Sequence, residues 1–268
     1  MASISFAAKP PVSTPSTDAP VAPEVSYPSN IDKPEVSLAV APAPANTLAV
    51  AAPVVASGVV GEVSMSDIKL PRLNLVQKVG SLADNFQPGS IVFEKSYVLS
   101  NGKPEQSLDL TPLQFRKQYQ RKTAWGEGDS SEQPEVYDTM EEVRRAGGSL
   151  QYGDENYFQE IAHIAFAVRL PEHVQAGDEI FDLFPYKFAD SLYAVAMWTV
   201  ASSSYTALGK RILTDSAMTL RNGLHTGHYM VCSEIRKNAK NSWYVPRASF
   251  AGKHTPEAAE FFASIINP

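Results

Sequence analysis

The prolines of this chain are concentrated in its first quarter, and their distribution limits which part can fold. Residues 1–66 contain 10 of the 20 prolines and no tryptophan, and Phe6 and Tyr27 are their only aromatic residues. Such a segment cannot bury enough apolar surface to offset the conformational entropy that folding costs. We therefore expect a disordered Pro/Ala-rich arm over 1–66, followed by a single folded domain over 67–268.

The apolar stretch 38–60 within this arm does not predict a membrane helix. Pro42, Pro44 and Pro53 interrupt it, and each removes a backbone donor from any helix that would span a bilayer. We expect no membrane contact. Cys232 is the only cysteine, which excludes a disulfide-stabilised scaffold.

Charge is sorted along the rest of the chain. The net charge is −6, which excludes a strongly basic nucleic-acid protein. Residues 67–125 carry a net charge of +4, residues 126–182 carry −11, and residues 183–268 carry +4. The two basic segments predict an anion-binding surface if they fold together. Ordinary solvated faces would give the same pattern.

Strand patterns dominate the folded part. Residues 91–99 and 108–125 predict two strands joined by a hairpin turn at Asn101-Gly102. Residues 126–160 are acidic and polar, and predict an inserted loop with a short helix over 136–145. Two apolar runs, 161–170 and 192–200, are typical of central strands.

The last third predicts a helix between strands. Ser202, Ser203 and Ser204 are suitable N-caps for a helix that closes near Asn222-Gly223. Two further strands follow, over 228–236 and 242–250, and Thr255-Pro256 begins a C-terminal helix. Three strand regions, a helix and two strands is the order of an OB-fold. We therefore predict a mainly β domain with α elements, an OB-fold-like Greek-key barrel with one helix between strands 3 and 4.

The second predicted strand carries cations between aromatic residues. One face presents Phe115, Lys117, Tyr119, Arg121 and Trp125. Such a face suits single-stranded nucleic acid, because bases stack on rings while cations contact phosphates. The alternative is that the aromatic residues belong to the core and that the cations lie paired at a sheet edge.

A second cluster lies at the tip between the last two strands. Arg236, Lys237 and Lys240 precede Trp243-Tyr244, and in an OB-fold the loop between strands 4 and 5 contributes to ligand binding. A soluble hairpin turn would have a similar composition.

Catalytic and cofactor motifs are absent from the sequence. It lacks a phosphate-binding Gly-x-x-x-x-Gly-Lys-Ser/Thr loop and a Gly-x-Ser-x-Gly elbow. His225, His228 and Cys232 have a zinc-like spacing without an evident fourth ligand. We predict no cofactor, no metal site and no enzymatic activity.

The segment Ile68-Lys69-Leu70-Pro71-Arg72-Leu73, with Gln77 and the turn Pro88-Gly89, resembles the opening of a diverse group of bacteriophage proteins. The later Lys-Asn-x-Lys-Asn and Trp243-Tyr244 are similar as well. The resemblance covers about residues 67–125 and 185–250, and some members look like single-stranded-DNA-binding proteins with an OB-type barrel. It implies single-stranded DNA as the partner, together with phage replication or recombination proteins, in the host cytoplasm. The apolar end 261–268 departs from the acidic tail that such proteins often carry.

These observations lead to one main hypothesis and one rival. The main hypothesis is a non-enzymatic single-stranded-DNA-binding protein for phage replication or recombination. The rival is a virion or assembly protein that does not bind nucleic acid. The predicted DNA-binding residues are Lys117, Tyr119, Arg121, Trp125, Arg236, Lys237, Lys240, Trp243 and Tyr244.

Overall fold

A computed structural model describes residues 69–122 and 134–266 of the chain. All of them fall within one compact unit. The predicted arm, 1–66, and Trp125 lie outside the described residues. The described part is mainly β, as the sequence predicted, with a few short helices.

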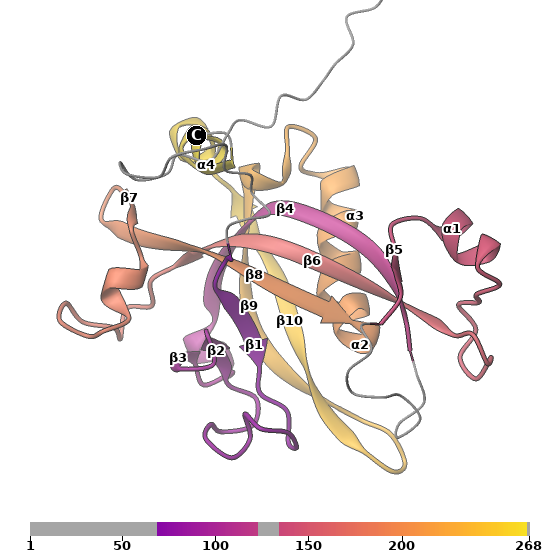
Figure 1. The fold of residues 1–268 in the computed structure, drawn as a ribbon. Helices are drawn as coiled ribbons and strands as arrows, with labels where there is room; N and C mark the ends of the chain where they lie inside the picture. Colours follow the sequence, from indigo (N-terminus) through magenta and orange to yellow (C-terminus); the bar gives the residue numbers. More distant parts are fainter. Residues whose placement is uncertain (1–68, 123–133, 267–268) are drawn as a thin grey trace, which may run out of the picture. The chain divides into compact units, whose positions relative to one another are not determined.

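Ten strands form one sheet that curls into a half-barrel (Figure 1). Eight of them follow one another in the order β10-β9-β4-β6-β8-β1-β2-β3, while β5 pairs with β4 and β7 with β8. The strands are β1 (Arg72–Leu75), β2 (Ile91–Phe93), β3 (Tyr97–Ser100), β4 (Leu108–Arg121), β5 (Val136–Tyr137), β6 (Phe158–Arg169), β7 (Tyr186–Phe188), β8 (Ser191–Ala201), β9 (Gly227–Lys237) and β10 (Ser242–Lys253).

The helices are short and lie mostly between strands. A helical segment follows β8, and a C-terminal helix follows β10, as predicted. The bounds are α1 (Met140–Arg145), α2 (Ser202–Ser204), the π-helical turn η4 (Tyr205–Gly209), α3 (Lys210–Met218) and α4 (Pro256–Ile266), with 3-10 turns η2 (Pro104–Gln106), η3 (Phe181–Leu183) and η5 (Leu224–Thr226).

Three long strands, β4, β6 and β8, form an antiparallel meander at the centre of the sheet. The two apolar runs that predicted central strands are β6 and β8. After the helical segment the chain returns along β9, which pairs with the start of β4 through Leu108 and Val231. The hairpin partner β10 then forms one edge of the sheet.

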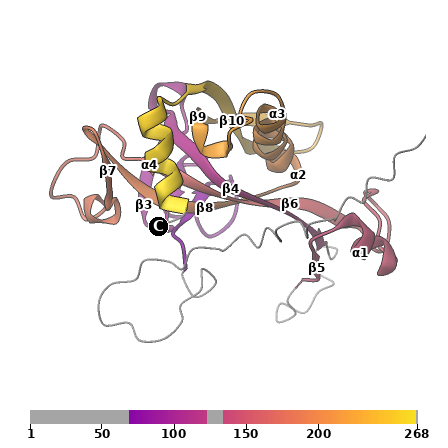
Figure 2. The same cartoon turned by 90° about the horizontal axis from the view of Figure 1, so that it is seen from above.

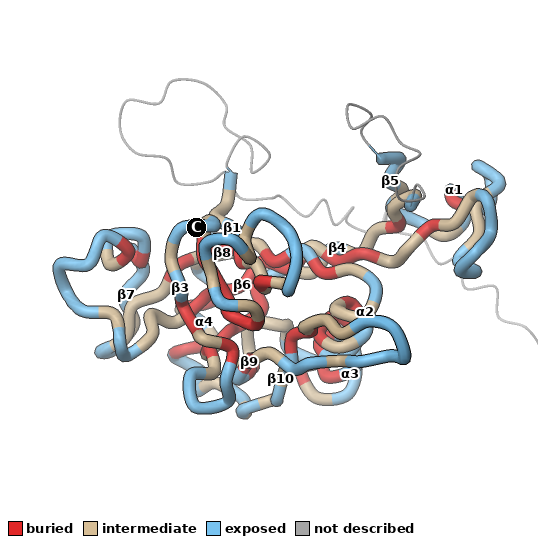
Figure 3. Tube along the Cα trace, turned by 90° about the horizontal axis from the view of Figure 1, so that it is seen from below, coloured by how far each residue is buried: buried red, intermediate tan, exposed pale blue. Residues whose placement is uncertain are grey.

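The main hydrophobic core lies on one face of the curled sheet, and Figure 3 shows buried residues concentrated along its central strands. Alternate residues of β6 and β8 point into it, including Ile164, Phe166 and Trp198. Leu208 and Ile212, from the helical segment, join the same cluster. Because successive side chains of a strand point to opposite faces, these alternate residues form one buried face of the sheet.

The opposite face of β6 and β8 is partly covered by α4 (Figure 2). Phe262 is buried there against Ala165 and Ala167, and Phe261 stacks on Phe188 with ring centroids 5.0 Å apart. The apolar chain end that departs from the acidic tail of single-strand-binding proteins is thus a packing element of this domain.

The hairpin predicted at Asn101-Gly102 is wrong. Glu94 and Lys95 both adopt positive φ and turn the chain between β2 and β3 instead, so the predicted strand 91–99 is two short strands. Gly102 has φ +81°, and a Cβ there would lie 1.9 Å from the carbonyl oxygen of Gly89. The glycine permits a close approach of two loops and does not form a hairpin turn.

The three serines after β8 do not cap the helix through their side chains. The hydroxyl of Ser202 donates to Gln159 on β6, and the hydroxyl of Ser203 accepts from the indole N–H of Trp243 on β10. The capping prediction is therefore wrong, because these hydroxyls tie the helical segment to two strands.

The curl of the sheet brings the chain after β1 beside β10. The side-chain amide of Gln77 donates to the carbonyl oxygen of Tyr244 and accepts from its N–H, both at 3.0 Å. An edge strand exposes such groups, and an amide side chain satisfies one donor and one acceptor at once. Gln77 therefore acts as a one-residue strand partner for β10.

Replacing Gln77 with alanine should lower the free energy of unfolding by about 1–3 kcal/mol, because two main-chain groups of Tyr244 lose their partners in a partly buried place. Urea denaturation measures this loss. The control is Gln87→Ala, an exposed amide ten positions later along the chain, which should change stability little. Equal losses for both variants would contradict the bridging role.

Two histidines connect α4 to the sheet. His254, just before α4, shares a 2.8 Å hydrogen bond with the buried Thr111, and its ring stacks on His228 with centroids 4.8 Å apart. His228 shares a hydrogen bond of 2.8 Å with Asp109. Burial, with His228 beside it, lowers the pKa of His254 from 6.5 to about 4. The fold therefore holds this imidazole neutral near pH 7.

A depressed histidine pKa makes the fold sensitive to acid. As the pH falls from 6.5 to about 4, His254 is protonated in the unfolded chain but stays neutral in the folded protein. The stability that this histidine contributes above pH 6.5 is therefore lost over this range. His254→Gln cannot titrate and should lose less stability over this range in urea denaturation. His173→Gln, at an exposed histidine, should behave like the parent. An acid loss as large in His254→Gln as in the parent would contradict this assignment.

Candidate nucleic-acid interface

The strand that was predicted to present a binding face is β4. Phe115 and Lys117 lie on the core-facing side of the sheet, because they share rows with Ile164 and Ala162 of β6. Tyr119 follows at the next alternate position and lies on the same side. A bulge between Pro112 and Gln114 sets this phase. The face of β4 on which aromatic residues and cations alternate is therefore the core-facing side of the sheet.

Tyr119 does not form an exposed stacking platform. Its side chain is only 8 % exposed and packs in a small cluster with Val143 of α1 and Phe158 of β6. The expectation of an exposed ring is therefore wrong, and the alternative that Tyr119 is a packing residue holds. The helix that covers Tyr119 is α1 of the acidic insertion. The alternating residue pattern of β4 does not indicate where this insertion packs.

The cations of this face are paired. Lys117 lies 2.6 Å from Glu160 and 4.9 Å from the centre of the Tyr119 ring. Partial burial lowers the pKa of Lys117, but its hydrogen bonds to Glu160 and Tyr119 outweigh this, and the net pKa is raised. Arg121 pairs with Glu135 at 3.5 Å and donates to Asn156 at 2.8 Å.

The far face of β4 is neutralised in the same way. Arg116 donates to both carboxylate oxygens of Asp138, at 3.0 and 3.1 Å, and Gln118 donates to Asp138 at 2.8 Å. These bonds from Gln118 and Arg116 hold the pKa of Asp138 below its usual value. Carboxylates of the acidic insertion therefore offset much of the positive charge of β4.

The hairpin tip, residues 236–243, keeps its cations free. Lys237 and Lys240 are exposed, Arg236 is half-buried, and none of the three forms an ion pair with a described residue. The side chain of Asn238 accepts from the N–H groups of Lys240 and Asn241, at 3.0 and 2.7 Å. The tip is thus a defined turn that presents positive charge to solvent.

The two aromatic residues beside the tip differ in their surroundings. Trp243, opposite Arg236 in the β9–β10 register, is half-buried and donates to Ser203 at 2.9 Å. The ring of Tyr244 packs on Gly89, where an added Cβ would lie 2.7 Å from it. Trp243 is therefore the better candidate for base stacking, whereas Tyr244 is engaged in loop packing.

Sequence reasoning missed a fourth cation at the tip. Lys78 follows the bridging Gln77, and its ammonium group donates to the hydroxyl of Ser242. The two residues are 164 positions apart in sequence. A strand pattern gives no sign of such a contact, although Gln77 was part of the motif that carried the resemblance.

A second polar surface lies on the outer side of the sheet, beyond the end of α4. Arg116, His163 and Thr199 form one row across β4, β6 and β8, and His163 shares a 2.9 Å hydrogen bond with Thr199. Burial, Arg116 and Arg72 lower the pKa of His163. This outer surface also went unpredicted.

The predicted residues therefore fall into two groups on either side of α2. Trp243 contacts Ser203 of α2 from the tip, and Gln159 of β6 contacts Ser202 from the other side. Trp125 lies outside the described residues. Within the described ranges no three histidine, cysteine, aspartate or glutamate side chains gather as metal ligands, and His225, His228 and Cys232 form no such group.

No known family model, curated protein or solved structure matches the chain. Among the described helices, none is long and apolar enough to cross a membrane.

Tyr119→Ala should lower the free energy of unfolding by about 3 kcal/mol, the usual loss for a buried ring. The control is Tyr152→Ala, an 83 % exposed tyrosine in the same insertion, which should change stability by less than about 0.5 kcal/mol. Chemical denaturation of both variants measures the difference. A Tyr119 variant as stable as the control would show that the ring is not a packing residue.

Proposed function

We propose that the protein binds single-stranded DNA without catalysing a reaction, through the hairpin tip and the outer surface of the sheet that carries His163 and Thr199. The observation that carries this proposal is the cluster of Lys78, Arg236, Lys237 and Lys240 beside Trp243, with none of the four in an ion pair within the described ranges. Free cations beside a ring are what single strands require, since phosphates and bases are bound by different groups.

The strand connectivity supports an OB-type arrangement. The meander β4-β6-β8 supplies three strands, the helical segment follows, and β9 and β10 supply the last two, with β9 beside β4. The extra strands β1, β2 and β3 extend the free side of β8, where β1 runs parallel to it. In this assignment the first strand is β4, and not residues 91–99 as the sequence suggested.

In this assignment the candidate surfaces correspond to the surfaces with which OB-folds bind oligonucleotides. OB-folds bind oligonucleotides on the face of strands 2 and 3 and on the loops that join strands 1–2 and 4–5. Here the corresponding elements are the outer face of β6 and β8, the acidic insertion and the hairpin tip. The negative charge of the insertion disfavours phosphate contact, which leaves the outer face and the tip as the proposed binding surfaces. Because α4 covers part of that face, the strand would contact the uncovered part with His163 and Thr199.

The residues of these surfaces have different roles in binding the strand. Lys78, Lys237 and Lys240 contact phosphates, Arg72 extends this contact along the sheet, and Trp243 stacks on a base. One stacked base contributes about 1–3 kcal/mol. The biological setting that fits is phage replication or recombination in the host cytoplasm, where proteins of those processes would share the exposed strand.

The test compares two variants with equal loss of charge. Lys237→Gln/Lys240→Gln removes two tip cations, and Arg144→Gln/Lys187→Gln removes two exposed cations elsewhere, on α1 and β7. Fluorescence anisotropy with a labelled strand of about 30 nucleotides gives affinity at several salt concentrations.

The parent and the control variant should bind with the same salt dependence. The tip variant should bind more weakly, and the slope of log affinity against log salt should fall in magnitude by about 1.4, for two lost phosphate contacts. No saturable binding by the parent at low salt would contradict the proposal and favour the assembly-protein hypothesis. Equal weakening in both variants would contradict the assignment of the tip.

A further inference from the structure

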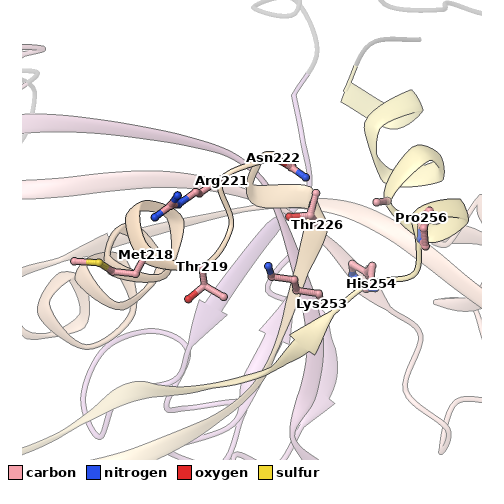
Figure 4. A pocket seen from close by; sticks show the side chains of 9 residues that line it. Met218, Thr219, Arg221, Asn222, Thr226, Lys253, His254 and Pro256 are labelled. Atoms are coloured by element: carbon pink, nitrogen blue, oxygen red, sulfur yellow. The ribbon is translucent and has the colours of Figure 1, made fainter.

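A separate pocket is lined by Thr226, which directly precedes β9, and by Lys253 at the end of β10. It therefore lies at the end of the β9–β10 hairpin opposite the tip. It has a volume of about 580 Å³, within the range of small-molecule sites. Figure 4 shows Thr219 and Arg221, from the chain after α3, on one side, and Lys253, at the end of β10, with His254 directly after it, on the other.

The charge of the pocket is one-sided. Arg221 and Lys253 line it, and no aspartate or glutamate is among the residues that do. Within the described ranges neither cation forms an ion pair or a side-chain hydrogen bond, in contrast to the paired cations of β4. Two unneutralised cations around one cavity favour an anionic ligand.

The carboxylate nearest to Lys253 along the chain is that of Glu257, which does not line the pocket. Glu257 lies in the first turn of α4, where hydrogen bonds from its own backbone and from Thr255 lower its pKa. His254 does line the pocket. It shares a hydrogen bond with Thr111 and stacks on the His228 ring, so it forms a fixed and neutral wall.

The remaining lining is divided between polar and apolar groups. Thr219 and Asn222 supply a hydroxyl and an amide that form no side-chain hydrogen bond with the described residues, whereas Met218, Pro256 and Ala259 supply an apolar surface. Hydroxyl and amide donors are common partners of phosphate oxygens. An apolar wall beside them suits a sugar or a base.

We propose that this pocket binds a phosphate group through Arg221 and Lys253, with Thr219 and Asn222 as further donors. The ligand is either inorganic phosphate or a nucleotide whose sugar or base lies against Met218 and Pro256. The site does not rest on the proposed DNA-binding function, because it lies apart from the tip and needs no strand.

Isothermal titration calorimetry of the full chain with inorganic phosphate and with thymidine monophosphate tests the site. Both probes should give saturable binding below about 10 mM in the parent. Arg221→Gln/Lys253→Gln should weaken it at least about tenfold, through loss of both charged contacts. Arg144→Gln/Lys187→Gln, with the same loss of charge, should bind as the parent does. Both cation pairs are exposed, so equal unfolding midpoints are expected for all three proteins.

The two probes distinguish the sources of the phosphate. Tighter binding of thymidine monophosphate supports a nucleotide site in which the apolar wall contributes, and equal binding supports a site for the phosphate group alone. Failure of both probes to bind the parent would overturn the proposal. Binding that survives in Arg221→Gln/Lys253→Gln, or that is lost equally in the control, would overturn it as well.

Discussion

The side-chain amide of Gln77 holds together two parts of the sheet that no strand pairing joins. It satisfies the N–H and the C=O of Tyr244 on edge strand β10, and in the same step it places Lys78 against Ser242. Edge strands expose main-chain groups that must find partners. One residue thus both bridges two parts of the curled sheet and brings a cation to the hairpin tip.

A second constraint is how the acidic insertion relates to the basic strand β4. Asp138 and Glu135 pair with Arg116 and Arg121, and α1 of the insertion covers Tyr119. Exposed ion pairs of this kind contribute little to stability, about 0–1 kcal/mol each. Their main consequence is electrostatic, since they neutralise cations of β4, whereas the cations of the hairpin tip form no ion pair within the described ranges.

The sequence predicted the elements better than their arrangement. The apolar runs of β6 and β8, the hairpin β9–β10 and helix α4 follow from local patterns, because strand alternation and a Thr-Pro helix start act over a few residues. The prediction for Asn101-Gly102 was wrong because a close approach to Gly89 also requires a glycine. Local pattern does not distinguish these two demands.

In the candidate site, too, local sequence patterns do not reveal long-range contacts. The tip could be predicted because its cations and rings are contiguous in the sequence, between two clear strands. The burial of Tyr119 depends on α1, and the contribution of Lys78 depends on a contact 164 residues away. Long-range packing decided which cations are paired and which remain free, and a single sequence carries no record of it.

The central claim is that a nucleic-acid strand would lie along the tip and the outer face of the sheet. Photochemical cross-linking of the full chain to a single strand containing halogenated uracil, followed by mass-spectrometric mapping, tests this claim most directly. The account predicts cross-links in the peptides that carry residues 72–78 and 236–243, with Trp243 the main adduct. Cross-links confined to the acidic insertion around α1, or their absence under conditions of binding, would contradict it.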